Sequence, residues 1–469
     1  MSAAAALVLA AALAGCGTTT YFAGRTLPPS GLTNRVLITI QNPSSASSGL
    51  LQFVDAYYDI RFVYNSKSTG AQFAISGYSG KLPTTIQNLP EEEMGEVYNS
   101  GTGVLTPISY AKEQASSAVT GLNGTSSSVF ITRNQNYVFA ASQAAHVFTV
   151  VDRTIGASYP LSLSDVYRVS VNPGGSVALV FAQNSNYVYY PRRLTAAQTL
   201  SYSGGPTTWP TGAVDCEPMS GPGWCLFQAL DPATGNPLTF DRPVKAVFSA
   251  DGGTAYVLNC GPECGGSKAS VTPLPVAPMI FLLAQQSGSL PTQIALNSST
   301  IAIPGGASNA LVDSSTLYVV GQEYTGGYWG GNLTTVNLST NKVSLPAVPI
   351  SDGAPGAASR MILADDDTLW IGMTRCTSGL RANSNLAYGC LTMFNTSTNA
   401  ATLMPYDGDA TGIAAVTGLH KIYTAEGGQI YIYSTVDGTA IDNQYVTVTG
   451  TAFDVAYMDA LTDDNNTVY

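Results

Sequence analysis

Residues 248–259 read Phe248-Ser249-Ala250-Asp251-Gly252-Gly253-Thr254-Ala255-Tyr256-Val257-Leu258-Asn259. The Asp-Gly-Gly triplet is suited to a hairpin turn, because aspartate and glycine accept the positive φ angles that tight turns require. The apolar run after the triplet has the length and composition of a strand that is buried on both faces. This segment therefore predicts two antiparallel strands joined by a short turn.

The same turn-then-strand pattern recurs along the chain. Its centres, aligned with Tyr256, are Tyr137, Ala178, Tyr318, Trp370 and Tyr423. Successive centres are separated by 41, 78, 62, 52 and 53 residues. A four-stranded propeller blade takes roughly 40 to 50 residues, so the spacing predicts one blade per repeat, with loop insertions in the longer intervals.

A second strand follows most of these centres and ends in Asp, Asn or Ser before a polar turn. It occurs at residues 147–152, 333–337, 391–395 and 430–434. Together the two strands resemble the YVTN-type repeat of lactonase-like β-propellers, whose pattern is Phe-Ser-Pro-Asp-Gly, then Tyr-Val, then Val-Ile-Asp. The resemblance spans about residues 120–440, although Ala178 replaces the usual aromatic residue and Asp365-Asp366-Asp367 stands where Asp-Gly is expected. It implies the fold and says little about activity, because one fold hosts many functions, and no catalytic residue is carried over from it.

The two ends of the chain are expected to close the ring. Residues 34–118 lack the clean repeat but contain strand-like segments at 36–41, 51–58, 72–77 and 104–110. These segments predict one N-terminal blade. Repeat blades occupy 119–440, and the strand-like segments 445–448 and 453–458, within 441–469, are expected to pair with the N-terminal blade. Such pairing removes free sheet edges. We therefore predict an all-β fold, a seven-bladed β-propeller over 34–469, with eight blades as the alternative because the interval between Ala178 and Tyr256 has room for another.

The N-terminus resembles a bacterial lipoprotein signal. An apolar run at residues 3–12 is followed by Leu13-Ala14-Gly15-Cys16, a small-residue cleavage signal that ends in cysteine. The run is shorter than the roughly 20 residues that a membrane-spanning helix needs. We therefore expect residues 1–15 to be a signal peptide, Cys16 to carry acyl chains such as palmitate, and residues 16–33 to form a flexible tether. The location expected is the bacterial cell envelope, with the outer membrane favoured because Gly17, and not Asp, follows the cysteine.

The remaining six cysteines fall into three pairs that are close in sequence, which predicts three local disulfides. The pairs are Cys216 with Cys225, Cys260 with Cys264, and Cys376 with Cys390. Metal binding is the rival interpretation for Cys260 and Cys264, but a Cys/His site would need ligands from distant blades, since His146 and His420 are the only histidines.

Charge limits the kinds of partner. Only 10% of the residues are charged, and the formal net charge is −11. A nucleic acid requires a positive protein surface, so nucleic acid is not expected as a partner. No cofactor is predicted. Calcium is the one metal considered. Its weak candidate ligands are Asp407 and Asp409, and a second acidic run occurs at 463–466. Neither of the two segments matches a calcium-loop pattern.

Three regions are candidates for binding. The first is the Gly-aromatic loop at 324–331, with Tyr324, Tyr328 and Trp329, whose alternative interpretation is a hairpin with its aromatics folded over the sheet. The second is the cluster of Tyr187, Tyr189, Tyr190, Arg192 and Arg193. Its aromatic and basic groups suit an acidic ligand, and the alternative interpretation is an exposed strand end. The third is the insertion from Trp209 to Trp224, which is large enough to cover one mouth of the ring.

Catalytic groups are present without a recognisable arrangement. The acidic run Glu91, Glu92, Glu93 and Glu96 is interpreted as a solvated loop or helical turn, and each histidine as structural or exposed. No Gly-x-Ser-x-Gly elbow, phosphate-binding loop or paired-histidine motif occurs. The sequence therefore favours a lipid-anchored envelope propeller that binds a protein or glycan partner. The alternatives are a lactonase-like or other hydrolase with its site in the central channel, and a structural scaffold in envelope assembly.

Overall fold

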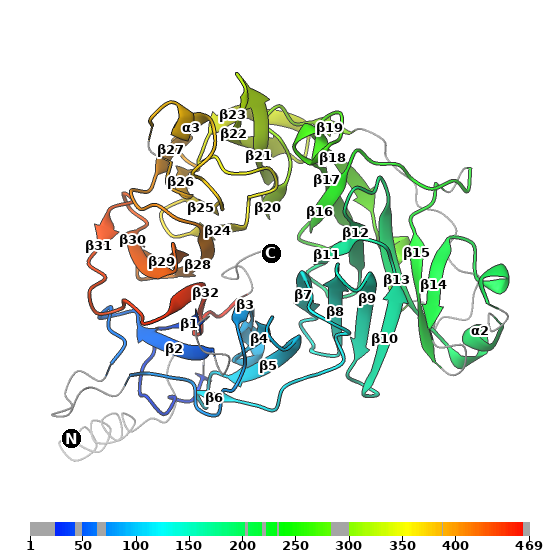
Figure 1. Cartoon of the computed structure of the whole chain (residues 1–469), viewed down its shortest axis with the longest axis horizontal. Helices are drawn as coiled ribbons and strands as arrows, with labels where there is room; N and C mark the ends of the chain where they lie inside the picture. Colours follow the sequence, from blue (N-terminus) through cyan, green and yellow to red (C-terminus); the bar gives the residue numbers. More distant parts are fainter. Residues whose placement is uncertain are drawn as a thin grey trace, which may run out of the picture.

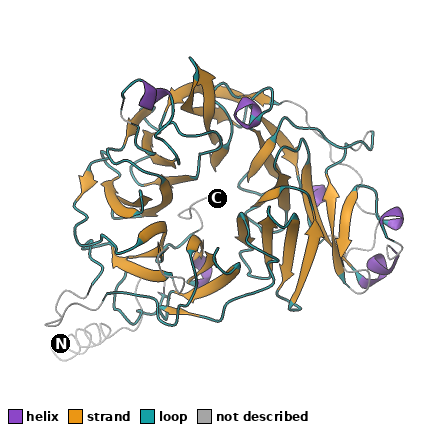
Figure 2. Cartoon of the chain, in the orientation of Figure 1, coloured by secondary structure: helices purple, strands orange, loops and turns teal. Residues whose placement is uncertain are grey.

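The computed structural model describes residues 24–42, 49–62, 72–201, 205–217, 222–231, 234–282, 300–386 and 388–462. These residues form eight antiparallel sheets. The sheets are arranged around a central axis, as blades of a β-propeller (Figure 1). Strands dominate, and the few helical segments lie outside the sheets (Figure 2). The protein is therefore an eight-bladed propeller, and the main prediction of seven blades is wrong.

We number the blades by their innermost strands, which contact one another around the ring. For blades 1 to 8 these strands are β3 (Pro83–Leu89), β7 (Ser128–Ile131), β11 (Val166–Val171), β16 (Pro243–Phe248), β20 (Asn309–Asp313), β24 (Arg360–Ala364), β28 (Ala410–Val416) and β32 (Thr451–Tyr457).

The second and third strands of the blades contain the repeat found in the sequence. The second strands are β4 (Met94–Asn99), β8 (Tyr137–Ser142), β12 (Ala178–Ala182), β17 (Thr254–Asn259), β21 (Thr316–Thr325), β25 (Thr368–Gly372), β29 (Lys421–Glu426) and β1 (Arg35–Gln41). The third strands are β5 (Val104–Ser109), β9 (Val147–Asp152), β13 (Val188–Leu194), β18 (Ser270–Pro275), β22 (Tyr328–Asn337), β26 (Leu391–Asn395), β30 (Gln429–Ser434) and β2 (Leu50–Asp55). All six predicted repeat centres lie on second strands, so the predicted blade pattern is confirmed.

The outer strands are more exposed, and most of them are short. They are β6 (Gln114–Ala115), β10 (Ala157–Ser162), β19 (Ile301–Ala302), β23 (Lys342–Pro349), β27 (Ala400–Leu403) and β31 (Ala440–Ile441). Blade 3 differs, because β15 (Gly223–Gln228) is its fourth strand and β14 (Ala213–Glu217) its fifth. The long interval between Ala178 and Tyr256 therefore widens one blade and adds no further blade. It also holds α2 (Ala196–Ser201) and the short 3-10 turn η3 (Pro206–Thr208).

The blade count differs from seven because residues 34–118 supply strands to two blades. β1 pairs with β32 and with β2, so both ends of the chain build blade 8, as predicted for ring closure. β3 to β6 form blade 1 by themselves. The segment 72–77 contributes only isolated bridges, such as Gln52 with Ala74, and 445–448 is not a strand.

The missed strands β3 and β4 surround the acidic run. Glu91 and Glu92 lie in the 3-10 turn η2 (Pro90–Glu92), and Glu93 has a φ of 48° at its end. Glu96, by contrast, is buried in β4, where its carboxylate receives two hydrogen bonds from Arg153 at 2.6 and 2.7 Å. The interpretation of the whole run as a solvated loop is therefore wrong for Glu96, because a partner in the next blade compensates its charge.

The core lies between the blades. Seven buried apolar clusters together fill every junction around the ring, including the junction of blade 8 with blade 1. A second strand such as β8 is buried along its whole length, because a neighbouring blade covers each face of its sheet. This arrangement explains why the repeat consists of continuous apolar runs and not of alternating ones.

Residues 24–33 were predicted to be part of a flexible tether, but the chain packs against the ring there. Arg25 is 8% exposed and donates hydrogen bonds to the carbonyls of Pro90 and Ala460 at 2.7 and 2.9 Å. Ser30 Oγ donates to Glu113 at 2.5 Å. Cys16 and the rest of the predicted signal lie outside the described residues.

All three predicted disulfides are present: Cys216–Cys225, Cys260–Cys264 and Cys376–Cys390. The first joins β14 to β15, the second closes the 3-10 turn η4 (Gly261–Cys264), and the third joins the two ends of the loop between β25 and β26. Within the described ranges, no helix is long and apolar enough to cross a membrane.

Candidate functional site

The two ends of the ring are built from different turns. Because neighbouring strands are antiparallel, the turns between second and third strands lie at the same end as the connections that lead into the innermost strands. We call this end the upper face, and the opposite end the lower face. The loop at 324–331, the Cys260–Cys264 turn and His146 lie on the upper face, whereas His420 lies on the lower face.

A pocket of about 350 Å³ opens on the upper face. Its walls include Tyr167 and Arg168 from β11, Arg242 just before β16, Val244 from β16, and Glu263 from η4. Ser308, Pro355 and Gly356, which precede β20 and β24, complete the wall. Since these residues lie where innermost strands begin, the pocket borders the mouth of the central channel. We call it the mouth pocket.

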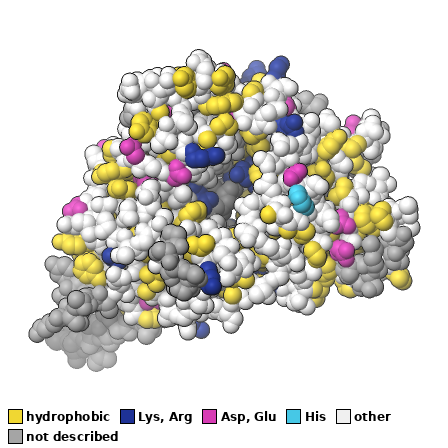
Figure 3. All heavy atoms as spheres, viewed as in Figure 1, with side chains coloured by type: hydrophobic (Ala, Val, Ile, Leu, Met, Phe, Trp, Pro, Cys, Tyr) yellow, Lys and Arg dark blue, Asp and Glu magenta, His cyan; other side chains and the backbone are white. Residues whose placement is uncertain are grey.

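Three cationic side chains lie near the starts of innermost strands, and Arg168 is the one of them that lines the mouth pocket. Arg168 is the third residue of β11, Lys245 the third of β16 and Arg360 the first of β24. We call them the cation cluster. They come from blades 3, 4 and 6, and Lys and Arg side chains gather around the central hollow on the face shown in Figure 3. Tertiary structure therefore concentrates positive charge at one place in a protein whose net charge is −11.

Lys245 is the most deeply buried member of the cluster, with 1% of its surface exposed. Its ammonium group donates a hydrogen bond of 2.7 Å to Asn309 Oδ1, the only acceptor that it has among the described residues. Burial, followed by the nearby positive charges of Arg168 and Arg360, lowers the pKa of Lys245 well below its usual value. An ammonium with one neutral acceptor is poorly compensated.

The two arginines differ in their partners. Arg168 is half-buried and lines the mouth pocket, with its guanidinium 5.5 Å from the centre of the Tyr167 ring. No hydrogen bond or ion pair of the Arg168 side chain involves a residue that the structure describes. Arg360 Nη2, in contrast, lies 3.3 Å from Asp454 Oδ2, which also accepts a hydrogen bond of 2.8 Å from the Ile86 amide. Asp454 thus balances one of the three positive charges.

Glu263 connects the mouth pocket to blades 5 and 6. Its carboxyl group accepts hydrogen bonds from the amides of Gln322 and Gly356, at 3.0 and 2.7 Å, and one from Gln322 Nε2 at 3.3 Å. Burial raises the pKa of Glu263 above its usual value, against the effect of these donors. Gln322 Nε2 also donates to the Ala354 carbonyl at 2.6 Å, so Glu263 and Gln322 hold the pocket wall in place.

The predicted Gly-aromatic loop is the tip of an extended hairpin. β21 and β22 have ten residues each, twice the length of the second strands in blades 3 and 6, and they pair in register to Thr325 and Tyr328. The rings of Tyr324 and Trp329 contact each other at 5.2 Å, and 59% of Tyr324 is exposed. We call residues 323–329 the aromatic hairpin. Gln322, which immediately precedes the aromatic hairpin, donates hydrogen bonds to Glu263 and so links the hairpin to the wall of the mouth pocket.

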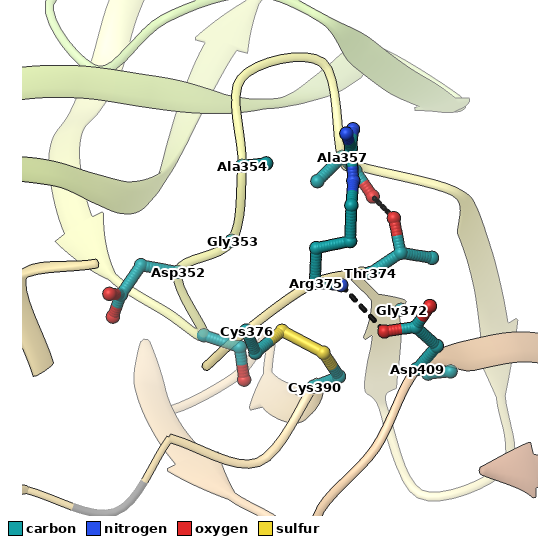
Figure 4. Close-up of a disulfide and its surroundings, with 12 residues drawn as sticks. Asp352, Gly353, Ala354, Ala357, Gly372, Thr374, Arg375, Cys376, Cys390 and Asp409 are labelled. Carbon is teal, nitrogen blue, oxygen red and sulfur yellow. Dashed lines mark hydrogen bonds between the residues drawn. A yellow bond between two sulfur atoms is a disulfide. The ribbon is translucent and has the colours of Figure 1, made fainter. Parts of the chain in front are cut away.

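The third disulfide shapes another part of this face. Figure 4 shows the Cys376–Cys390 bond beside Arg375, whose backbone amide donates a hydrogen bond of 2.6 Å to Asp409 Oδ1. The exposed Arg375 side chain extends along the loop at 354–357, which contributes to the wall of the mouth pocket. Asp409 thus accepts a hydrogen bond from a backbone amide.

Most members of the Tyr187 to Arg193 cluster lie inside blade 3. Arg192 is 2% exposed, donates to the Pro278 carbonyl, and lies 5.6 Å from the Phe227 ring centre. Arg193 pairs with Asp152 at 3.2 Å. The alternative prediction of an exposed strand end is therefore wrong for both arginines, because each contacts partners from neighbouring strands or blades. Tyr189 and Tyr190 are also buried, and Tyr187 is half-buried.

The two tryptophans of the blade 3 insertion differ. Trp224 is 1% exposed and contacts the rings of Tyr137 and Phe281 at 5.5 and 5.6 Å, so it is a core residue and not part of a binding loop. Trp209 is half-buried against the same blade.

The histidines and aspartates do not converge. His146 and His420 are both exposed, and His420 Nδ1 lies 2.8 Å from Asp366 Oδ2. Across the ranges that the structure describes, no group of three or more His, Cys, Asp or Glu side chains is placed to hold a metal ion. Calcium at Asp407 and Asp409 stays a prediction, and residues 463–466 lie outside the described ranges.

Sequence reasoning missed the cation cluster, although a signal existed. Arg168, Lys245 and Arg360 lie ten or eleven residues before the repeat centres Ala178, Tyr256 and Trp370. Aligning the innermost strands by these centres would have placed the three cations together. A single basic residue in an apolar strand does not by itself indicate a binding site.

No protein-family model matches the chain, and no curated protein is similar to it in sequence. Solved β-propeller structures are similar to it in fold, among them the periplasmic gluconolactonase PpgL of Pseudomonas aeruginosa, with 13% identity, a TM-score of 0.41, and coverage of 90% of this chain and 98% of that one. Apo AztD from Citrobacter koseri has 11% identity and a TM-score of 0.48, over 91% of this chain and 98% of that chain. Hydrazine synthase of Kuenenia stuttgartiensis has 11% identity and a TM-score of 0.47, over 81% and 100%. At such identities only the fold is comparable, so the site is argued from this chain's own residues.

Proposed function

We propose that this protein is a binding module of the bacterial cell envelope, anchored through lipidated Cys16, that takes a glycan on its upper face. The observation that carries the proposal is the exposed aromatic hairpin, which the hydrogen bonds of Gln322 with Glu263 link to the wall of the mouth pocket. Exposed aromatic faces stack on the apolar faces of sugar rings, and a neighbouring polar pocket orients the end of the chain. The volume of about 350 Å³ lies in the range of small-ligand sites.

Binding fits the geometry better than hydrolysis does. Acid–base catalysis needs a proton donor or acceptor with a free position toward the substrate. Glu263 is the one carboxyl group among the described residues of the pocket wall, and three N–H donors already occupy it. No specific observation favours the lactonase-like alternative, so we do not propose it.

The test is binding of oligosaccharides released from bacterial envelopes, divided into neutral and acidic pools, to the purified full-length protein. Tyr324→Ala and Trp329→Ala should each weaken binding by about tenfold or more, equivalent to about 1.4 kcal/mol. Tyr57→Ala is the matched control, because Tyr57 is also 59% exposed but follows β2 on the lower face. Binding that neither hairpin variant changes would overturn the glycan proposal, as would recovery of a crosslinked envelope protein on the aromatic hairpin in place of any glycan.

The anchor has a separate test. Cells that express the full chain with a clickable palmitate analogue should label the wild-type protein, and Cys16→Ala should abolish the label while leaving the three disulfides intact. Equal labelling of both proteins would refute lipidation at Cys16.

A further inference from the structure

We propose that the inner end of the mouth pocket is an oxyanion-binding site, in which Arg168, Lys245 and Arg360 hold a carboxylate, phosphate or sulfate group. The site itself is independent of the glycan proposal. Its extension, that the glycan is an acidic one, rests on the proposed function.

The cation cluster carries more positive charge than the described residues around it compensate. Burying an ammonium without a counter-charge is costly, and bringing two guanidinium groups close to it adds repulsion. Among the described residues, Lys245 has Asn309 as its one acceptor, and Arg168 has neither a hydrogen bond nor an ion pair. Asp454 pairs with Arg360. The local excess of positive charge is therefore balanced best by an anion from outside the described chain.

The cation cluster is reached through Arg168. Arg168 is half-buried and forms part of the pocket wall. Lys245 follows the wall residues Pro243 and Val244, and its acceptor Asn309 follows the wall residue Ser308. Arg168 is the one member of the cation cluster in the pocket wall, so an anion that enters the mouth pocket meets its guanidinium first, whereas Lys245, with 1% of its surface exposed, lies outside that wall.

The donor groups of the cation cluster match the oxygens of an oxyanion. A guanidinium presents a planar fork of N–H donors that matches two oxygens of one oxyanion, and an ammonium adds a compact charge with three donors. Lys245 has two donors left after its bond to Asn309, counting contacts with described residues. Carboxylate, phosphate and sulfate all satisfy this donor set, whereas a neutral sugar does not.

The cation cluster is built on rigid elements. The three cations lie within the first three residues of innermost strands, and blade junctions packed with apolar side chains hold those strands. Donors fixed in this way lose little freedom when an anion binds. Such preorganisation distinguishes the cluster from lysines scattered on the surface.

The experiment measures binding of inorganic phosphate, sulfate and acetate to the full-length protein at fixed ionic strength, by calorimetry and by the shift in thermal unfolding midpoint. We expect saturable binding of at least one anion and a rise in the unfolding midpoint. Lys245→Met and Arg168→Gln should each weaken binding by about tenfold or more. Lys342→Met, on the exposed outer strand β23, is the matched control and should leave binding unchanged.

A second readout separates this role from a merely structural one. Methionine fills a volume similar to that of lysine without the charge, so Lys245→Met should raise the unfolding midpoint in the absence of anions and remove its response to them. A structural lysine would instead give a lower midpoint with an unchanged response. That result would overturn the proposal.

Two further outcomes would also overturn it. One is an anion effect of equal size in the wild type and both cluster variants. The other is binding that appears only after residues 463–469 are removed, which would mean that the acidic end of the chain itself occupies the site. Failure of the glycan proposal is distinguishable, because Trp329→Ala should leave phosphate binding unchanged. Glucuronate and glucose then separate an acidic sugar from a free anion, since glucuronate should compete with phosphate and glucose should not.

Discussion

Several buried charged side chains in this protein pair with partners in other blades. Glu96 in blade 1 is held by Arg153 of blade 2, and Asp152 of blade 2 by Arg193 of blade 3. Neither partner could be assigned from the sequence, because the pairs are 57 and 41 residues apart. The ion-pair partners of individual buried side chains are therefore what the sequence of this protein predicts least well.

Glu426 predicts a pH dependence of stability. Burial raises its pKa from 4.5 to about 7, although Thr424 and Tyr433 donate hydrogen bonds to it. The folded state then binds more protons than the unfolded state between pH 4.5 and about 7, so the contribution of Glu426 to stability is full below pH 4.5 and is lost as the pH rises to 7. The loss is about 3 kcal/mol.

Chemical denaturation at a series of pH values checks this expectation. Glu426→Gln should remove the decline across that window, because glutamine does not ionise. Glu92→Gln, at an exposed position, is the control and should preserve it. An unchanged pH profile in Glu426→Gln would show that other groups cause the decline.

Trp224 predicts a stability effect without a binding effect. Its ring is buried against Tyr137, Phe139 and Phe281, so Trp224→Ala should lower the free energy of unfolding by about 3 to 5 kcal/mol through the cavity that it leaves. Trp209→Ala, at a half-buried site, should cost less. Urea unfolding measures both. A stable Trp224→Ala variant with weakened ligand binding would instead support the prediction from the sequence that this tryptophan belongs to a binding region.

At the scale of elements, the blades differ mainly in their additions. Blade 3 has the β14–β15 hairpin, and blade 5 the long strands β21 and β22. The three disulfides lie in such irregular parts and not in the central strands, because the central strands are already held by hydrogen bonds and packing. Function is expected where the blades depart from the repeat.

The disulfides predict a graded cost. Cys376 and Cys390 are 14 residues apart, whereas Cys260 and Cys264 are 4 apart. Closing the longer loop restricts the unfolded chain more, so replacing Cys376 and Cys390 with alanine should cost about 3 kcal/mol, about 1 kcal/mol more than replacing the shorter pair. Urea unfolding of the two double variants gives both values. A larger cost for the shorter pair would show that native contacts of η4 outweigh the loop effect.

At the scale of the whole molecule, the ring is held closed by polar contacts as well as by strands. Arg35 of β1 is 2% exposed and pairs with Asp459 at 2.7 Å and with Glu113 at 2.9 Å. These contacts join the N-terminal strand of blade 8 to the chain after β32 and to blade 1. The last junction of the ring thus depends on residues that are up to 424 positions apart.

Removing this arginine should open the ring where it closes. Arg35→Met leaves two buried carboxylates without their partner, so we expect a loss of about 3 to 5 kcal/mol in the free energy of unfolding. Hydrogen exchange should show the loss of protection first in β1 and β32. Arg133→Met removes an exposed pair with Glu91 and should cost less than about 1 kcal/mol. Uniform loss of protection in all blades would argue against a local role in closure.

The sequence by itself determined the propeller architecture, the second strands of six blades, the third strands of four of them, ring closure by both termini and the three disulfides. Each depends on a local signal: a turn triplet beside an apolar run, or cysteines a few residues apart. Only the tertiary structure decided the count of eight, because residues 34–118 are divided between blades 8 and 1 by a pairing with a strand more than 400 positions away. It alone also assembled the cation cluster, since Arg168, Lys245 and Arg360 become neighbours only when the ring brings the innermost strands of three blades to one axis.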